Sequence, residues 1–117
     1  IRDWLFVEDH IEALIKILLN GNVGKRYCIG GNQEISNMEL IKLICRKLDI
    51  KLKRKKCSEE LIYFVDDRLG HDYRYSIDSS FIKKDINWIP KTNLNLGLDK
   101  TIGWYLKNLS WINSTLT

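Results

Sequence analysis

The sequence predicts one mixed α/β domain that covers residues 1–117. Two observations lead to this class. Segments with apolar residues at helical spacing follow residues that begin helices, and short runs of β-branched and aromatic residues lie between them. The length leaves room for one hydrophobic core, and neither an internal repeat nor a Pro/Gly/Ser-rich linker divides the chain.

The first helix is expected soon after the apolar run Trp4–Val7, which is too short to distinguish a strand from a helix. Glu8 or Asp9 suits the beginning of this helix. Four apolar residues then recur at i, i+3, i+4 and i+7 and predict a face turned toward the core: Ile11, Leu14, Ile15 and Leu18. Gly21 is expected to end the helix in the left-handed conformation that favours glycine.

A strand is expected at Arg26–Ile29, just before two glycines. Residues 36–39 then read Ser-Asn-Met-Glu, the S-x-x-E pattern of a capping box, which predicts a second helix. Its expected inward residues are Leu40, Ile41, Ile44, Cys45 and Leu48. Cys28 and Cys45 both fall within apolar patterns, so we expect them to be small core residues.

Leu61–Val65 is expected to be a strand because it is rich in aromatic and β-branched residues. A polar loop over residues 66–75 follows it. Asp78 or Ser79 suits the beginning of a short helix that ends before Pro90.

A last helix is expected from about Asn95 to Asn108, followed by a polar tail, Ser110–Thr117, that should fray. The expected inward residues of this helix are Leu98, Ile102, Tyr105 and Leu106. The composition, 44% hydrophobic and 29% charged, is that of a folded globular protein. Apolar runs stay far below the ~20 residues that span a bilayer, so we expect no membrane partner.

The beginning of the chain does not resemble a signal peptide, because acidic and basic residues interrupt it. A chain that starts at Ile1, without Met, is expected to be a fragment. The three cysteines form no C-x-x-C pair and no cluster with histidine. We therefore expect reduced thiols and a cytoplasmic location.

The formal net charge of +4 is unevenly distributed. The run from Lys51 to Lys56 holds five of the positive charges, which leaves −1 for the rest of the chain. A nucleic-acid interface needs a broader basic face, so we interpret this run as a solvated loop or edge strand. Binding of nucleic acid through it is the less favoured alternative, and we expect no nucleic-acid partner.

Two arginine segments about 65 residues apart offer the best candidate for a binding site. Arg2 lies beside Asp3, and a guanidinium there can present two parallel N–H groups to phosphate oxygens. Arg68 shares a polar loop with His71 and with Gly70, which allows close approach of the backbone to a ligand. The alternatives are a surface arginine paired with a neighbouring carboxylate, and a solvated turn.

Asn37 follows the expected helix cap and lies near unpaired backbone N–H groups, a place that suits an anion or a carbonyl. Ordinary capping is the alternative reading of this residue. We find no phosphate-binding glycine loop, no Tyr-x-x-x-Lys pair and no spacing typical of metal ligands or of a nucleophile elbow. The sequence therefore predicts binding residues and no catalytic residues or metal site.

Four stretches resemble, in order and spacing, the C-terminal third of the dTDP-glucose 4,6-dehydratases, members of the extended short-chain dehydrogenase/reductase family. They are Arg2–His10, Tyr27–Asn32, Asp67–Asp72 with Arg74–Asp78, and Trp88–Leu106. The resemblance covers nearly the whole chain. It implies an α/β fold that is the substrate-binding portion of an extended Rossmann-type dehydratase, without most of the parallel sheet.

The resemblance also implies the ligand, dTDP-glucose or a related nucleotide sugar. Arg2 and Arg68 would hold its diphosphate, and the pocket would be completed by Asn37 and the loop Asp67, Leu69, Gly70 and His71. Leu69 stands where family members usually have proline, and Tyr73 where they often have arginine. Neither departure removes a proposed contact.

In this family the glycine-rich loop for NAD, the Tyr-x-x-x-Lys pair and an Asp-Glu pair precede the point that corresponds to Ile1. The resemblance therefore implies a segment of an NAD-dependent lyase, of deoxysugar and lipopolysaccharide O-antigen synthesis, that is inactive alone. It implies a homodimer for the family and leaves the oligomeric state of this chain open. The alternative is a degenerate remnant or a non-catalytic module that binds nucleotide sugars.

Overall fold

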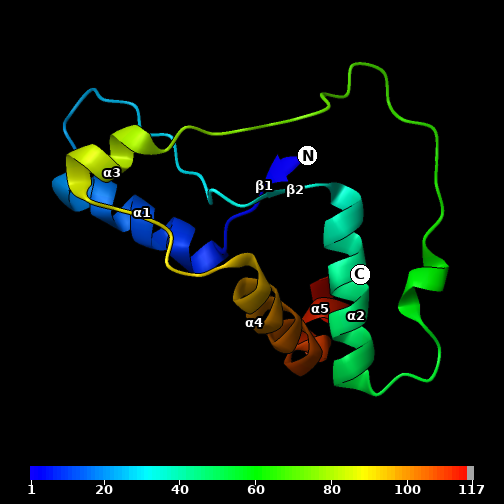
Figure 1. Ribbon diagram of the computed structural model, residues 1–117. Coiled ribbons are helices and arrows are strands. Elements are labelled where there is room, and N and C mark those ends of the chain that lie inside the picture. Colours follow the sequence, from blue (N-terminus) through cyan, green and yellow to red (C-terminus); the bar gives the residue numbers. More distant parts are fainter. Residues whose placement is uncertain (116–117) are drawn as a thin grey trace.

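The computed structural model describes residues 1–115. Its elements follow one another along the chain as shown in Figure 1. They are β1 (Arg2–Asp3), α1 (Val7–Asn20), β2 (Glu34–Ile35), α2 (Asn37–Leu52), the 3-10 helix η1 (Ser58–Leu61), α3 (Ser80–Ile86), α4 (Leu94–Lys107) and α5 (Leu109–Thr115). The described part of the chain is thus mostly helical, with one small sheet.

The sheet has two antiparallel strands, in which Arg2 lies opposite Ile35 and Asp3 opposite Glu34. The carboxylate of Asp3 accepts hydrogen bonds from the backbone N–H groups of Gly31 and Gln33, each at 2.8 Å. A side chain at Gly31 would lie 2.1 Å from the Trp4 carbonyl oxygen, so only glycine fits there. These contacts hold the segment before β2 against β1. Arg2, in β1, belongs to the site described below.

Helix α1 begins at Val7, after Phe6, so the prediction of a start at Glu8 or Asp9 is late by one or two residues. Asp9 is 5% exposed, and its carboxylate accepts hydrogen bonds from the backbone N–H groups of Thr92 and Lys91, at 2.8 and 3.2 Å. This carboxylate docks α1 onto the segment before α4. The prediction for the end of the helix is wrong in one respect: Gly21 is extended, with φ of −73°.

The core is small and centres on Ala13 of α1, Ile82 of α3 and Trp88, which are at most 1% exposed. The predicted inward face of α1 is wrong. Its residues are largely exposed, with fractions of 49% for Ile11, 46% for Leu14, 52% for Ile15 and 83% for Leu18. The helix is apolar on two sides, and the core occupies only the side of Ala13.

The predicted capping box of α2 is confirmed. Ser36 Oγ accepts a hydrogen bond from the backbone N–H of Glu39 at 3.1 Å, and the Glu39 carboxylate accepts one from the backbone N–H of Ser36 at 2.9 Å. The hydrogen bonds from the backbone and hydroxyl of Ser36 lower the pKa of Glu39. The helix ends at Leu52, and the cap residue Lys53 that follows it is left-handed with φ of 50°.

Replacing Ser36 by Ala should lower the free energy of unfolding by about 1 kcal/mol at neutral pH, because it removes an N-cap. A group with a lowered folded-state pKa stabilises above its unfolded pKa, about 4.3 for Glu. It loses that contribution as the pH falls through the folded-state pKa. The penalty for Ser36→Ala should therefore shrink in acid. Urea unfolding of the wild type and the variant, at neutral and at acidic pH, measures this penalty. An equal penalty at both would contradict the coupling of the two residues.

Both predicted later strands are wrong. Residues 26–29 are irregular, although Tyr27 and Ile29 pack against the core. In the segment 61–65, Leu61 is the last residue of η1, and residues 62–65 have no sheet partner in the described chain. Tyr63 and Phe64 there are 81% and 87% exposed. Pairing partners decide whether such residues form a strand, and the described chain offers none.

The cysteine predictions are partly wrong. Cys28 is exposed rather than in the core, Cys45 is half-buried, and Cys57 is exposed. All three are free thiols. Burial raises the pKa of the Cys45 thiol, and the nearby carboxylates add to this effect.

The predicted short helix and last helix are confirmed as α3 and α4, within one or two residues of their expected bounds. On α4, Ile102 is buried, but Tyr105 is 50% exposed rather than inward. The predicted fraying of the tail is wrong up to Thr115, because α5 continues to that residue. The last two residues of that predicted tail lie outside the described part.

Candidate nucleotide-sugar site

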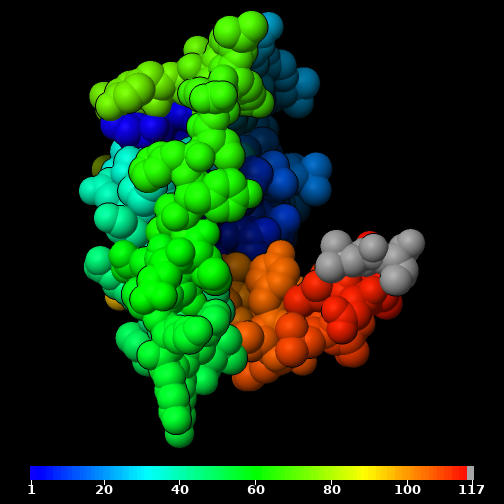
Figure 2. Space-filling model, turned by 90° about the vertical axis from the view of Figure 1, so that its right-hand side faces the viewer, coloured from blue at the N-terminus to red at the C-terminus, as the bar shows by residue number. Residues whose placement is uncertain are grey.

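Residues 62–79, here called the strap, connect η1 to α3 without any helix or strand. The strap contains the predicted polar loop and passes across the molecule beside the small sheet (Figure 1). In Figure 2 the green surface that includes its first half runs along most of one face of the molecule. The Tyr75 backbone N–H donates to the Ile1 carbonyl at 3.0 Å, which fastens the strap to the chain just before β1.

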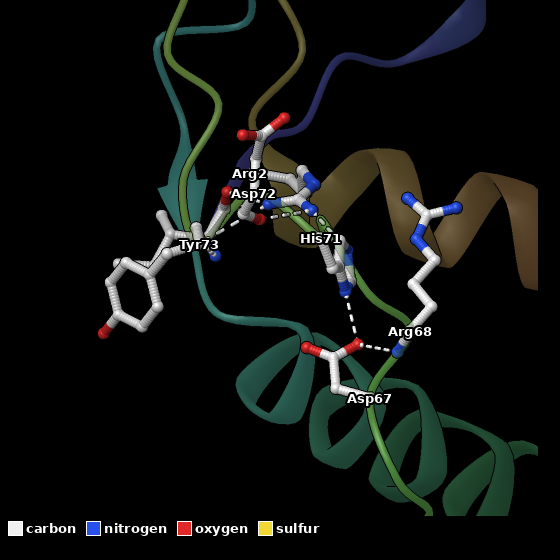
Figure 3. A network of polar contacts seen from close by, with 7 residues as sticks. Arg2, Asp67, Arg68, His71, Asp72 and Tyr73 are labelled. Atoms are coloured by element: carbon white, nitrogen blue, oxygen red, sulfur yellow. Dashed lines mark hydrogen bonds and ion pairs between the residues drawn. The ribbon is translucent and has the colours of Figure 1, made fainter.

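Arg2 is the centre of the contact between β1 and the strap (Figure 3). Its Nη2 lies 2.7 Å from His71 Nε2 and 3.0 Å from the Asp72 carbonyl oxygen. Its Nη1 donates to the carbonyls of Ile1 and Tyr73, at 2.8 and 3.4 Å. Two of the predicted site residues, Arg2 and His71, are thus in direct contact although they are 69 residues apart.

All four terminal N–H groups of Arg2 therefore have acceptors within the protein. The guanidinium carbon also lies 4.5 Å from the centroid of the Tyr75 ring, in cation–π geometry. The alternative of a surface arginine paired with Asp3 or Glu8 does not describe this arrangement. Arg2 is half-buried and fastens the strap, and its positive charge lies within the site.

Asp67 completes a chain of polar contacts. Its Oδ1 lies 2.7 Å from His71 Nδ1 and accepts a hydrogen bond from the Arg68 backbone N–H at 2.8 Å. The hydrogen bond from His71 is the main cause that lowers the pKa of the Asp67 carboxyl, followed by the backbone N–H of Arg68. The carboxylate is thus held in its charged form between two donors.

Arg68 differs from Arg2 because its side chain forms no hydrogen bond or ion pair with any residue of the described chain. Figure 3 shows its guanidinium pointing away from the Asp67 carboxylate. Its five N–H donors are available to an anion. Gly70 takes a left-handed conformation with φ of 72°, and Leu69 is fully exposed. The turn that they form carries Arg68 and His71 on either side.

Asn37 is the first residue of α2, and its exposed side chain has no hydrogen-bond partner within residues 1–115. The register of the sheet places Ile35 opposite Arg2, and Asn37 follows two residues later. Strand pairing thus brings Asn37 toward the same end of the molecule as Arg2, without direct contact between them.

Several contributions to the site were not predicted from the sequence. The Tyr75 ring and the carbonyls of Asp72 and Tyr73 hold Arg2. The strap is further tied to β2, where Glu34 pairs with Arg74 at 2.6 Å and accepts a hydrogen bond from Ser76. Carbonyl contacts leave no signature in a sequence, and neither does the contact of Tyr75 with Arg2, because the two residues lie far apart along the chain.

The model of the GDP-mannose 4,6 dehydratase family matches residues 1–101. The chain belongs to this family. A dTDP-glucose 4,6-dehydratase of Neisseria meningitidis serogroup B is 45% identical over 120 residues, which cover 99% of this chain and 34% of that relative.

Among solved members of the family, a dTDP-glucose 4,6-dehydratase of Bacillus anthracis in complex with NAD has a TM-score of 0.76 and 38% identity. One of Streptomyces venezuelae, with NAD and TYD bound, has a TM-score of 0.82 and 31% identity. Each alignment covers 93% of this chain and 32% of the solved chain. The chain thus spans about a third of the length of the relatives that it matches.

Residues 1–115 lack two features that would indicate other classes of site. No helix among them is long and apolar enough to cross a membrane. Nor do they contain a group of three or more His, Cys, Asp or Glu side chains that could hold a metal ion.

Proposed function

We propose that this chain is the substrate-binding, C-terminal segment of a dTDP-glucose 4,6-dehydratase, and that its site receives the diphosphate of a nucleotide sugar. One observation carries the proposal: Arg2 from the beginning of the chain and the loop of Asp67 to His71 converge, and the Arg68 guanidinium of this loop has no hydrogen-bond or ion-pair partner within residues 1–115. Two permanent positive charges neutralise a diphosphate and orient it.

The contacts suggest different tasks for the two arginines. Arg68 is the direct ligand, because its planar donors are free for phosphate oxygens. Arg2 contributes charge while its terminal N–H groups hold the strap, and Asn37 adds a neutral donor at the beginning of α2. Leu69 and Gly70 form the turn that lets a ligand approach the backbone.

The full reaction, loss of water from dTDP-glucose, lies outside what this chain can do alone. NAD, which is bound in the solved relatives, would supply reversible oxidation of the sugar. The chain has no glycine-rich loop to hold NAD and no Tyr-x-x-x-Lys pair, so we assign it no redox step. Its free thiols fit the reducing cytoplasm, where sugar nucleotides for surface polysaccharides would be made.

Calorimetric titration with dTDP tests the proposal. The chain should bind with micromolar affinity, and Arg68→Ala should weaken binding at least tenfold, because charge-assisted hydrogen bonds contribute about 1.5–3 kcal/mol. Arg26→Ala, which removes an exposed arginine outside the site, should leave the affinity unchanged.

A folded chain that does not bind dTDP would instead fit the alternative of a remnant without ligand. Binding that is equally weakened by Arg26→Ala would indicate attraction to overall charge only. Two residues of the basic run from Lys51 to Lys56 have partners within the chain: Lys51 Nζ lies 4.0 Å from Asp99 Oδ1, and Arg54 donates to Ser58 at 3.0 Å.

A further inference from the structure

The contacts of His71 determine which of its ring nitrogens carries the proton. An ionised carboxylate only accepts hydrogen bonds, and a guanidinium only donates them. His71 lies between the two, with Nδ1 2.7 Å from Asp67 Oδ1 and Nε2 2.7 Å from Arg2 Nη2. Both contacts are satisfied only by a neutral imidazole that donates from Nδ1 to Asp67 and accepts at Nε2 from Arg2.

The same carboxylate oxygen also reaches the second cation of the site. Asp67 Oδ1 accepts from the Arg68 backbone N–H at 2.8 Å, so one atom is linked to Arg68 directly and to Arg2 through the imidazole. The Asp67 side chain is 73% exposed and makes no contact with Arg2 itself. Its hydrogen-bonded link to the guanidinium therefore passes through the imidazole of His71.

We propose that Asp67 is a positioning residue of the diphosphate site, which fixes the tautomer of His71 and thereby holds Arg2 and Arg68 in the arrangement that receives the ligand. This inference rests on the proposed function for the identity of the ligand. In this role Asp67 does not bind the ligand directly, because its carboxylate would repel a neighbouring diphosphate.

Because of this repulsion, the two possible roles of Asp67 predict opposite changes in ligand affinity when its side chain is removed. If Asp67 acted only through its charge, its removal would raise the affinity for a diphosphate. As a positioning residue it is needed, so Asp67→Ala should weaken dTDP binding about tenfold, the effect of a lost charge-assisted hydrogen bond. Asp67→Asn keeps an oxygen that accepts from Nδ1, so it should bind nearly as the wild type does.

The matched control is Asp66→Ala, which removes the same charge from the adjacent exposed residue of the strap. Its side chain has no partner within residues 1–115, so its loss should not weaken binding. A wild-type level of binding or tighter binding by Asp67→Ala would overturn the inference, as would an equal loss in Asp66→Ala.

A second measurement needs no ligand. ¹⁵N NMR of the imidazole rings should show His71 protonated at Nδ1 in the wild type and in Asp67→Asn, and a shift of the proton toward Nε2 in Asp67→Ala. The other histidine, exposed His10, should be unaffected and serves as the internal reference. Protonation of wild-type His71 at Nε2 would overturn the inference. If the wild type does not bind dTDP, the proposed function fails, and this measurement alone decides whether Asp67 orients Arg2.

Discussion

Replacing Trp88 by Ala is expected to destabilise the chain by about 3–5 kcal/mol, the usual cost of removing a buried Trp side chain. Trp88 is 1% exposed and lies at the centre of the core, against Ala13 and Ile82. Such a loss is a large share of the 5–15 kcal/mol that stabilises typical domains. Because this core has few other members, we expect most molecules of the variant to be unfolded near room temperature.

Far-UV circular dichroism during urea titration measures this effect, with two control variants. Trp111→Ala removes an indole that is 54% exposed, so it should cost far less. Trp88→Phe keeps most of the buried volume and removes an indole N–H that has no hydrogen-bond partner among residues 1–115, so it should be milder than Trp88→Ala. Similar unfolding midpoints for Trp88→Ala and Trp111→Ala would show that the core is elsewhere.

Local signals in the sequence predicted the helices well, because capping acts within a few residues. The S-x-x-E pattern gave the beginning of α2, and the apolar spacing gave α1 and α4 within two residues. Strands depend on partners that are distant along the chain. Tyr63 and Phe64 have the composition of a strand but remain exposed and unpaired in the described chain.

The site was predicted to the extent that it depends on side-chain type. Arginine, histidine and carboxylate residues around a glycine turn indicated a site for a diphosphate, and the structure places Arg2 against His71. The sequence could not show that the terminal N–H groups of Arg2 are already engaged, because the acceptors at Asp72 and Tyr73 are backbone carbonyls. It therefore could not distinguish the two arginines, although their surroundings differ.

The outer face of α1, the side that carries Leu14 and Leu18, is exposed although the sequence predicted that it faces the core. This exposed face leads to the second prediction with a large expected effect. Helices that are apolar on two sides are normally covered on both, yet Leu14 and Leu18 are 46% and 83% exposed. The chain spans about a third of the length of its relatives. If the proposed function is correct, the NAD-binding portion of such a dehydratase covers this face when the two parts associate.

Changing Leu14 and Leu18 together to Lys should therefore abolish association with a separately expressed NAD-binding portion of the Neisseria relative. Burial of each leucine contributes about 1.5–3 kcal/mol, so the pair should lower the affinity at least a hundredfold. Size-exclusion chromatography of the mixture, with dehydratase activity as a second readout, measures the loss. Circular dichroism should show that the variant remains folded, because neither side chain belongs to the core.

Val23→Lys is the matched control, since Val23 is fully exposed and lies outside α1. It adds a lysine without removing apolar surface from the helix, so it should leave association and activity unchanged. The double variant should also be more soluble than the wild type when expressed alone, because it replaces part of an exposed apolar patch. Undiminished association of the double variant would mean that the outer face of α1 is not the surface that contacts the NAD-binding portion.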